Sequence, residues 1–372
     1  MPNTRRMQMA SAGTGGAGFF DVSGNLWGSG RGEKILGDNT YTDKSSPVQI
    51  KADVTNWAEV YPMTDGTVGI TATGDIYTWG SGKSSTRAGA VSSPVLISGE
   101  AGSGGWSALS ANGDSWSAIK DGKLYSCGKN TFGSLGLGDT TNRSSPIQVG
   151  SLTDWASLGA SDRSIFAIKT DGTLWSWGYN SYGRLGHGDS TNRSSPVQVG
   201  SLTNWLSVGQ SEYCPTFLKT DGTLWSVGEG SYGSNGQGNT TTYSSPVQVG
   251  SATNWTKVGG CNQVTMAINS SNELWVCGRN DDGQLGLNIS TSTNKSTLTQ
   301  ISGAWKDFFA LQASVLAVKT DGTLWAWGNN GQGRLGLGDT TNRSAPVQVG
   351  SLTSWIAGAG MGAKGDAAFY LR

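Results

Sequence analysis

Hydrophobic and polar residues alternate in short runs along the chain, and one run returns at a fixed interval. Residues 170–178 show it most clearly: the polar turn Thr-Asp-Gly-Thr leads into the aromatic stretch Leu-Trp-Ser-Trp, which stops at a glycine. The closing glycine recurs every 48 to 50 residues, at Gly30, Gly80, Gly128, Gly178, Gly228, Gly278 and Gly328. A period in this range is typical of repeat architectures.

Each repeat contains four short stretches that favour β-structure. In one repeat they are residues 196–199, 205–209, 216–219 and 224–227. They are rich in β-branched and aromatic residues and are bounded by Gly, Asn, Asp and Pro, as strands are. The dipeptide Asp221-Gly222 between the last two predicts a tight hairpin. No stretch has helical periodicity, so we expect an all-β protein.

Strands in fours, repeated seven times, predict a seven-bladed β-propeller of four-stranded blades. A linear solenoid would need atypical capping repeats, and the sequence has none. The chain begins in mid-repeat near residue 19 and ends in mid-repeat after Trp355. We therefore expect the N- and C-terminal segments to pair in one blade and close the ring. We expect residues 19–372 to form the propeller and residues 1–18 to form a flexible Gly-rich arm.

One tryptophan marks the same position in every repeat. The seven residues are Trp57, Trp106, Trp155, Trp205, Trp255, Trp305 and Trp355. A large aromatic side chain that returns once per repeat indicates an ordered core, although 58 glycines alone could indicate disorder. We expect these side chains to pack between blades.

The amino-acid composition argues against two kinds of function, nucleic-acid binding and insertion into a membrane. Lys and Arg total 26, Asp and Glu total 26, and the net charge is zero. A nucleic-acid-binding protein normally has a basic excess, so we expect no nucleic-acid partner. No apolar run reaches the roughly 20 residues of a membrane span, and no signal peptide is recognisable, so we expect neither membrane insertion nor export by a cleaved signal. The location would be a virion if the chain is phage-encoded, and otherwise the cytoplasm.

Residues 174–180, 183–188 and 195–199 (LWSWGYN, GRLGHG and SPVQV) resemble the regulator of chromosome condensation repeat. The resemblance covers nearly all of residues 19–372 and implies a seven-bladed propeller. Members of that family include an exchange factor for a small GTPase that binds chromatin, secreted inhibitors of β-lactamases, and interaction platforms. The family often has a histidine before the third strand. This chain has none there; the equivalent positions are Asp65, Asp114, Arg163, Tyr213, Gln263 and Ala313.

The sequence contains few side chains that could form a catalytic or metal-binding site. His187, the one histidine, lies between two glycines and is expected in an exposed turn. Cys127, Cys214, Cys261 and Cys277 form no metal-binding pair and are expected to be buried. The recurring Asp and Asn of the motif Gly-Asp-Thr-Thr-Asn are typical of turns. We predict no catalytic residues, no metal site, no cofactor and no enzymatic activity.

We predict binding residues at the positions where the sequence differs from one repeat to the next. The loops before the third strand vary while their surroundings stay nearly constant, and varied loops on a rigid scaffold often carry recognition. The candidate binding residues are Asp162, Arg163, Glu212, Tyr213, Asn262, Gln263, Gln312, Lys364 and Asp366. Residues 180–183 and 230–233 add a second set of tips that carry tyrosine.

The predicted function is a structural or protein-interaction propeller. The regular Ser-, Thr- and Asn-rich repeats resemble those of phage and bacterial surface proteins. They favour a virion component, a decoration or host-contact element attached to other virion proteins through residues 1–18. One alternative is a cellular adaptor or inhibitor of a single protein partner. A second is a guanine-nucleotide exchange factor for a small GTPase.

Overall fold

The computed structural model describes residues 18–20, 26–30, 37–38, 40, 42–50, 54, 56–64, 66–80, 91–97, 103–209, 211–310, 312–355, 357–359 and 367–371. Its secondary structure is β-strand, apart from one turn of 3₁₀ helix, η1, at Ser181–Gly183. No described helix has the length and apolar character needed to cross a membrane.

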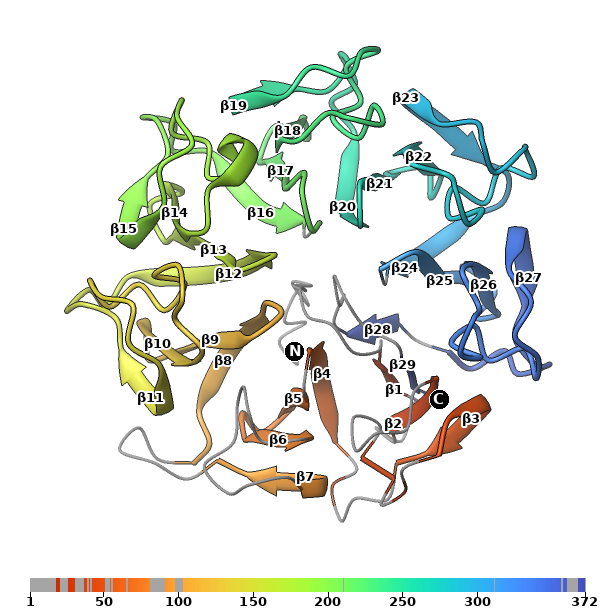
Figure 1. Cartoon of the computed structure of the whole chain (residues 1–372), viewed down its shortest axis with the longest axis horizontal. Helices are drawn as coiled ribbons and strands as arrows, with labels where there is room; N and C mark the ends of the chain where they lie inside the picture. Colours follow the sequence, from red (N-terminus) through yellow and green to blue (C-terminus); the bar gives the residue numbers. More distant parts are fainter. Residues whose placement is uncertain are drawn as a thin grey trace, which may run out of the picture.

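The strands form a β-propeller of four-stranded blades arranged around a common centre (Figure 1). Each four-stranded blade is an antiparallel meander that runs from the centre to the rim. Six such blades consist of β4 (Trp57–Met63), β5 (Gly66–Thr71), β6 (Ile76–Gly80) and β7 (Val91–Leu96); β8 (Trp106–Ala111), β9 (Ser115–Lys120), β10 (Lys123–Gly128) and β11 (Arg143–Gln148); β12 (Trp155–Ser161), β13 (Ser164–Lys169), β14 (Leu174–Gly178) and β15 (Arg193–Gln198); β16 (Trp205–Gly209), β17 (Thr216–Lys219), β18 (Leu224–Gly228) and β19 (Tyr243–Gln248); β20 (Trp255–Cys261), β21 (Val264–Asn269), β22 (Leu274–Gly278) and β23 (Lys295–Ile301); and β24 (Trp305–Ala310), β25 (Ser314–Lys319), β26 (Leu324–Gly328) and β27 (Arg343–Gln348).

A further sheet of five strands combines both ends of the chain. Its strands are β1 (Gly18–Phe20), β2 (Leu26–Gly30), β3 (Lys44–Gln49), β28 (Ala357–Ala359) and β29 (Ala367–Leu371). β28 pairs antiparallel with β1, and β29 pairs antiparallel with β2. β1 begins at Gly18, the last residue of the predicted arm, whose other residues lie outside the described part of the chain.

The tryptophan that begins each inner strand packs between blades, as the sequence predicts. Trp155 is 3% exposed and shares a core cluster with Ile119, Leu124 and Val149 of the preceding blade. Its ring meets that of Trp175 edge to face, with centroids 5.9 Å apart. Burial of a large aromatic at each junction gives neighbouring blades most of their shared apolar contact.

A backbone hydrogen bond repeats from one junction to the next on the rim. In each case an N–H in the long tip loop of one blade donates to a serine carbonyl at the start of the next blade's outer strand. The bonds are Gly138 to Ser194 (2.8 Å), Gly188 to Ser244 (2.7 Å), Gly238 to Ser296 (2.8 Å), Asn288 to Ser344 (2.8 Å) and Gly338 to Ser45 (2.9 Å). The last of these joins the β24–β27 blade to β3 of the five-stranded sheet.

The tip loops hold their shape through the recurring Asp and Asn. Asp189 Oδ1 accepts a hydrogen bond from the Thr191 N–H (2.8 Å), and Asp189 Oδ2 pairs with Arg193 at 2.6 Å. Asn192 Oδ1 accepts from the Asn180 N–H at 2.8 Å. The same bonds form around Asp139 and Asp339. These side chains therefore serve the turn, as their sequence pattern predicts.

Candidate functional site

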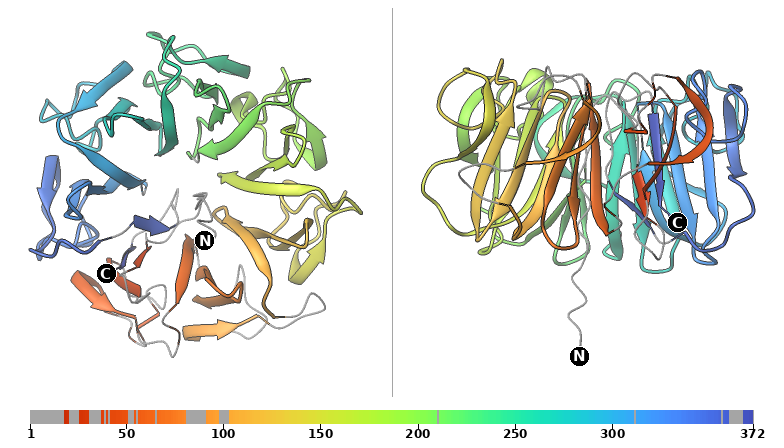
Figure 2. Two further views of the ribbon diagram at one scale, coloured as in Figure 1. Left: turned by 180° about the vertical axis from the view of Figure 1, so that it is seen from behind. Right: turned by 90° about the horizontal axis from the view of Figure 1, so that it is seen from below.

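The turns that follow the inner strands gather on one face of the molecule and touch across blades; we call this the loop face. The Thr64 N–H of the β4–β5 turn donates to the Gly113 carbonyl of the next blade (2.7 Å). Ser161 Oγ donates to the Ser211 carbonyl (2.6 Å), and Ser211 Oγ donates to the Cys261 carbonyl (3.0 Å). The long loop between β14 and β15 lies on the same face, because β12 and β14 run in the same direction (Figures 1 and 2).

Arg184 is the central side chain of the loop face. It comes from the tip loop of the β12–β15 blade and is fully buried. Its Nη1 donates to the Glu212 carbonyl (2.8 Å) of the next blade and to the Asp162 carbonyl (3.3 Å) of its own. Its Nε donates to the Ser181 carbonyl at 3.1 Å. One guanidinium group thus fastens three loops from two blades, a role that its planar set of five donors allows.

Two effects act in opposite directions on the pKa of Arg184. Burial lowers the pKa of the guanidinium, and the nearby Asp162 carboxylate, 4.0 Å from Nη1, opposes that change. Arg184 Nη2 is buried and has no hydrogen-bond partner among the residues that the structure describes. A cation held this way keeps its charge, because the intrinsic pKa of arginine lies far above neutrality.

Aromatic rings lie against this buried cation and continue outward. The Arg184 guanidinium carbon is 5.1 Å from the centroid of the Tyr179 ring and 5.2 Å from that of Tyr213. Tyr213 meets Tyr182 edge to face at 6.5 Å, and Tyr182 is 47% exposed. Tyr179 in turn contacts Phe132 of the preceding blade at 4.5 Å. Contacts within about 6 Å allow a cation–π attraction.

Arg163 stands at the surface beside this aromatic row. Its guanidinium carbon is 5.4 Å from the Phe132 ring centroid, and its Nε is 3.6 Å from Asp114 Oδ2. Lys129 pairs with the same aspartate at 2.8 Å. The Arg163 backbone has a φ of 56°, in the left-handed region that side chains other than Gly, Asn and Asp rarely adopt. A strained, charged residue at the tip of a turn is a signature of functional sites.

Glu212 and Tyr213 come from the turn between β16 and β17, in the blade that follows that of Arg184. Glu212 is 2% exposed, while Tyr213 is half-buried. The pKa of the Tyr213 hydroxyl is raised, first by burial and then by the charge of Glu212 and a hydrogen bond to it. The hydroxyl therefore stays protonated at neutral pH and remains a hydrogen-bond donor.

The loop face continues onto the next blade with the same chemistry. Arg279 lies 5.2 Å from the Tyr232 ring centroid and pairs with Asp281 at 2.7 Å. Gln263, whose φ is 54°, accepts the Arg279 N–H with its carbonyl at 2.9 Å. Cation–aromatic pairs therefore lie at three consecutive junctions: Arg163 with Phe132, Arg184 with Tyr213, and Arg279 with Tyr232.

The structure brings four of the nine predicted binding residues into one cluster. Asp162, Arg163, Glu212 and Tyr213 share one cluster, and Asn262 and Gln263 follow in the β20–β21 turn. Gln312 is half-buried in the β24–β25 turn, and in the described part of the chain no hydrogen bond or ion pair joins it to the others. Lys364 and Asp366 lie outside the described residues.

Sequence reasoning missed Arg184, Tyr179, Phe132 and Arg279. The signal for Arg184 was available, because the equivalent residues in the two flanking blades are Ser134 and Ser234. The position itself varies along the chain, because Gln284 and Arg334 occupy it in two further blades. Such variation is the same signal that marked the turns before the third strand.

The exposed turn expected at His187 needs correction. His187 lies in the tip loop but is half-buried, and its Nε2 is 3.0 Å from Ser176 Oγ. Its neighbours Gly186 and Gly188 do shape a turn, yet the ring lies against β14 where other repeats place Leu137, Leu287 and Leu337. Burial lowers the pKa of His187, so the ring is neutral at pH 7.

The cysteines and acidic residues form no recognisable reactive group among the described residues. Cys127, Cys214, Cys261 and Cys277 are buried and free, as predicted, and burial raises their thiol pKa values, to about 12 for Cys127 and Cys214. Such thiols are poor nucleophiles because the thiolate is scarce. Within the described ranges, no three His, Cys, Asp or Glu side chains are grouped so that they could hold a metal ion.

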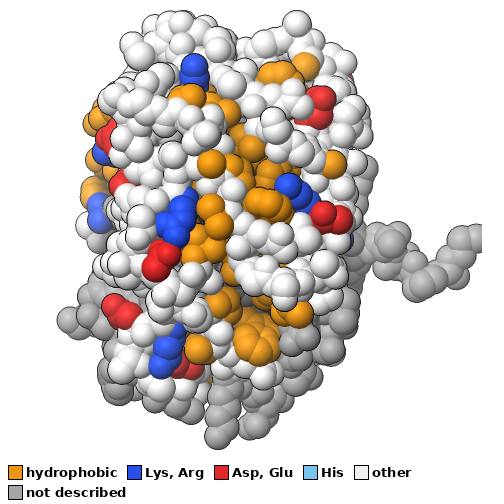
Figure 3. All heavy atoms as spheres, turned by 90° about the vertical axis from the view of Figure 1, so that its right-hand side faces the viewer, with side chains coloured by type: hydrophobic (Ala, Val, Ile, Leu, Met, Phe, Trp, Pro, Cys, Tyr) orange, Lys and Arg blue, Asp and Glu red, His pale blue; other side chains and the backbone are white. Residues whose placement is uncertain are grey.

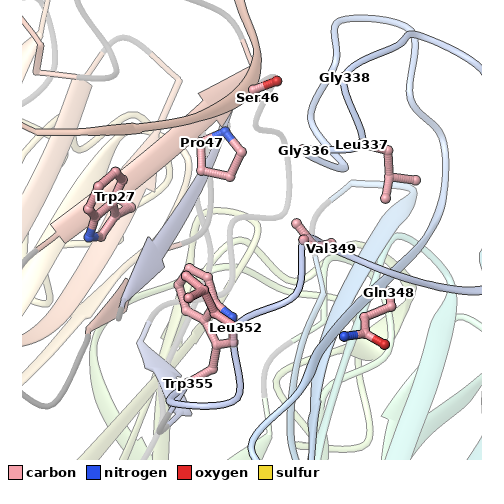
Figure 4. Close-up of a pocket in the computed structure, with 11 residues that line it drawn as sticks. Trp27, Ser46, Pro47, Gly336, Leu337, Gly338, Gln348, Val349, Leu352 and Trp355 are labelled. Atoms are coloured by element: carbon pink, nitrogen blue, oxygen red, sulfur yellow. The ribbon is translucent and has the colours of Figure 1, made fainter.

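Apolar grooves on the rim form a second candidate. One cavity of about 480 Å³ lies between Leu337 and Val349 on one side and Trp27 and Pro47 on the other, with Trp355 at its base (Figure 4). A cavity of about 490 Å³ recurs at another junction, lined by the equivalent residues Leu137, Val149, Trp175, Pro196 and Trp155. Because equivalent residues line both, these grooves belong to the repeat itself and distinguish no single blade.

The family model for the regulator of chromosome condensation (RCC1) repeat matches residues 121–168, 171–211 and 321–364, and a second model of the same description matches residues 155–184. The matched segments include Arg163 and Arg184. The chain is an RCC1-repeat β-propeller. Its RCC1 repeats thus account for the period of 48 to 50 residues and for the four-stranded blades.

Solved structures of other proteins agree with this fold. Human WBSCR16 is 16% identical, with a TM-score of 0.81 over 92% of this chain and 98% of that one. Prp20p from Saccharomyces cerevisiae, described with its binding properties to Gsp1p and histones, is 16% identical, with a TM-score of 0.78 over 90% of this chain and 88% of that one. At such identities the likeness concerns the fold alone. No curated protein sequence matches the chain.

Proposed function

We propose that this RCC1-repeat propeller is a non-enzymatic interaction module that binds a protein partner on the loop face. The observation that carries the proposal is the Arg184 guanidinium, buried between two blades with Tyr179 and Tyr213 on either side at 5.1 and 5.2 Å. Tyrosine and arginine are enriched among the few residues that dominate binding energy at protein interfaces. Here the buried arginine holds tyrosines that reach the surface.

Rigid support favours this face over the rest of the surface. Tyr182 is 47% exposed, yet its ring is positioned by Tyr213, which is positioned by Arg184. A preordered aromatic side chain loses little conformational entropy on binding. Arg163 and Arg279 flank it with charged groups that already contact acidic partners, so they can direct a polar rim around the aromatic centre.

We also propose that the five-stranded sheet is the seventh blade and that it closes the ring. The Gly338 N–H donates to the Ser45 carbonyl at 2.9 Å, as equivalent residues do between consecutive blades. The groove at this junction is lined by the same residue types as the groove at residues 136–196. One core cluster contains Leu335 and Val349 of the last blade together with Leu26, Trp57 and Trp355.

The exchange-factor alternative draws on the likeness to Prp20p, which is described as binding Gsp1p and histones. Against it stand the zero net charge and the absence of histidine at the six positions before the third strand. Release of labelled GDP from Gsp1p, measured with and without this chain, tests the alternative. Accelerated release would support exchange activity and overturn the non-enzymatic proposal.

A place in a phage particle is the narrower form of the proposal. It rests on the style of the repeats and on the N-terminal arm, of which only Gly18 is described. Deletion of residues 2–18 tests it: a virion protein anchored by the arm would no longer enter the particle. The rival is a cellular adaptor or inhibitor, whose binding to one partner would survive the deletion.

The loop face itself is tested by affinity capture from the native source with matched variants. Tyr182→Ala removes the most exposed ring of the loop face, and Leu202→Ala removes an equally exposed side chain (45%, against 47%) from the turn at the opposite end of the same blade. We expect Tyr182→Ala to lose the captured protein and Leu202→Ala to retain it. The reverse result would place the partner on the opposite face.

A further inference from the structure

The outer strand β23 differs from the other outer strands in one residue type that matters at a sheet edge. β3, β7, β11, β15, β19 and β27 each have proline at the fourth position, namely Pro47, Pro94, Pro146, Pro196, Pro246 and Pro346. β23 has Leu298 there and is seven residues long. Proline on an edge strand removes an N–H and so blocks pairing with another chain.

The missing proline exposes a donor on the outer side of the strand. In β15, Val197 lies opposite Ser176, and just after this strand the Val199 N–H donates to the Leu174 carbonyl at 2.8 Å. Successive residues of a strand point their N–H and C=O groups in opposite directions, so Pro196 and Gln198 face away from β14. By the equivalent register, in which Leu274 lies opposite Ile301 and Val276 opposite Thr299, Leu298 and Gln300 direct theirs away from β22.

The outer side of β23 is open at this point. Among the described strands, β23 pairs with β22 alone. The Ser296 carbonyl is already bonded to the Gly238 N–H, so the free part of the edge begins at Leu298. Thr297 and Gln300 are exposed. On this side of the rim, charged side chains are scattered around a band of apolar ones (Figure 3), so little charge opposes an approaching strand.

We propose that β23 pairs with β23 of a second copy of this chain, antiparallel and about a two-fold axis through Thr299. This register sets Leu298 against Gln300 of the second copy and Gln300 against Leu298 of the second copy. Those are the two residues whose backbone groups face outward, and each such pair exchanges two hydrogen bonds, which makes four. Thr299 meets its own copy on the axis, and Thr–Thr pairs stabilise neighbouring strands.

Charge also favours a second copy as the occupant. Lys295 is the one charged residue of β23, and it lies before the free part of the edge, so no like charges meet in the paired stretch. The pairing is isologous and closes as a dimer, as two-fold interfaces do. It lies on the rim, away from the loop face, and does not depend on the partner proposed there.

Sedimentation equilibrium of the full chain, from about 1 μM to about 500 μM, tests the proposal, because an edge contact of this size is expected to be weak. We expect reversible dimers in the wild type. Leu298→Pro gives β23 the residue that six other outer strands carry, so it should fold normally and raise the dimer Kd by at least about tenfold. A wild type that stays monomeric overturns the proposal, as does a dimer that persists unchanged in Leu298→Pro.

A charge pair on the axis provides a second test that does not rely on proline. Thr299→Lys and Thr299→Glu should each abolish the homodimer by repulsion, and a mixture of the two should restore a heterodimer. Val347→Lys, at the equivalent position of β27, is the control and should leave dimerisation unchanged. Failure of the mixture to associate would overturn the proposal, even if Leu298→Pro proved unstable.

Discussion

The Nη1 atom of Arg184 donates a 2.8 Å hydrogen bond to the backbone carbonyl of Glu212, which belongs to the next blade of the propeller. The flanking blades have Ser134 and Ser234 where this arginine stands, whereas the β24–β27 blade has Arg334, so the residue at this position varies from blade to blade. A side chain that joins two blades and also supports the tyrosines above it couples local stability to the shape of the loop face.

Replacing Arg184 with serine, the residue of the flanking repeats, should lower the free energy of unfolding by about 2 kcal/mol, because it removes several buried hydrogen bonds at once. Urea unfolding followed by circular dichroism measures this. Arg193→Ser is the control, since it breaks an exposed ion pair with Asp189 and should cost less than about 1 kcal/mol. Equal losses in the two variants would show that Arg184 does not clamp the blades.

Replacing Arg163 with glycine should separate stability from binding. Its φ of 56° suits glycine, so relief of backbone strain should offset the lost ion pair with Asp114 and leave stability within about 1 kcal/mol of the wild type. Capture of the partner should nevertheless weaken. Thermal unfolding and affinity capture on the same preparation test both parts. Full capture by Arg163→Gly would remove this residue from the proposed interface.

Glu59 should make the protein less stable as the pH rises. Burial raises the pKa of this carboxyl to about 8, although Tyr61 donates a hydrogen bond to it at 2.8 Å. The folded protein therefore holds the proton more tightly than the unfolded chain, whose pKa is near 4.5, and stability falls between pH 4.5 and about 8. Glu59→Gln should be the more stable form at pH 8 by about 2 kcal/mol. Urea unfolding at pH 5 and pH 8 tests this; parallel pH profiles would contradict it.

His187 should make the protein less stable as the pH falls. Burial lowers its pKa in the folded protein, so the unfolded chain binds the proton more readily and stability falls as the pH drops below the ordinary histidine value of 6.5. His187→Leu, which copies Leu137 and Leu337, should remove that loss and add about 1 kcal/mol at pH 5.5. Urea unfolding of the wild type and of His187→Leu, each at pH 5.5 and pH 8, measures this change in the free energy of unfolding. An unchanged difference would argue against a buried neutral ring.

Gly136 should tolerate no side chain. A Cβ there would lie 2.8 Å from Trp177 Nε1, which donates to the Ser134 carbonyl at 3.0 Å. Gly150 has a similar positive φ but open space around it, so Gly150→Ala reports the backbone cost alone. We expect Gly136→Ala to be less stable than Gly150→Ala by about 1–3 kcal/mol. Thermal unfolding of both variants gives the comparison.

The repeat in the sequence predicted the blades, because period, turn residues and buried tryptophans act locally within each unit. Because the repeats are nearly identical, each blade also contacts the next in the same way, as the bonds from Gly138 to Ser194 and from Gly188 to Ser244 show. The varied turns could also be found as departures from a constant frame, and Asp162, Arg163, Glu212 and Tyr213 do lie together.

The contacts across blades could not be predicted in the same way. Arg184 reaches Glu212 only because the tip loop folds back over the inner strands, and no local pattern specifies that path. His187 looked exposed between two glycines, yet the fold half-buries its ring against β14, where other repeats have a half-buried leucine. Burial of these residues depends on three-dimensional packing against a neighbouring element, which composition and spacing do not encode.

Site-specific photo-crosslinking in the native source tests directly whether a protein partner binds the loop face. A photoreactive amino acid is placed at position 182 on the loop face in one preparation and at position 202 on the opposite end of the blade in another. We expect a crosslinked protein partner from position 182 and none from position 202. Adducts from position 202 alone, or from neither position, would contradict this expectation.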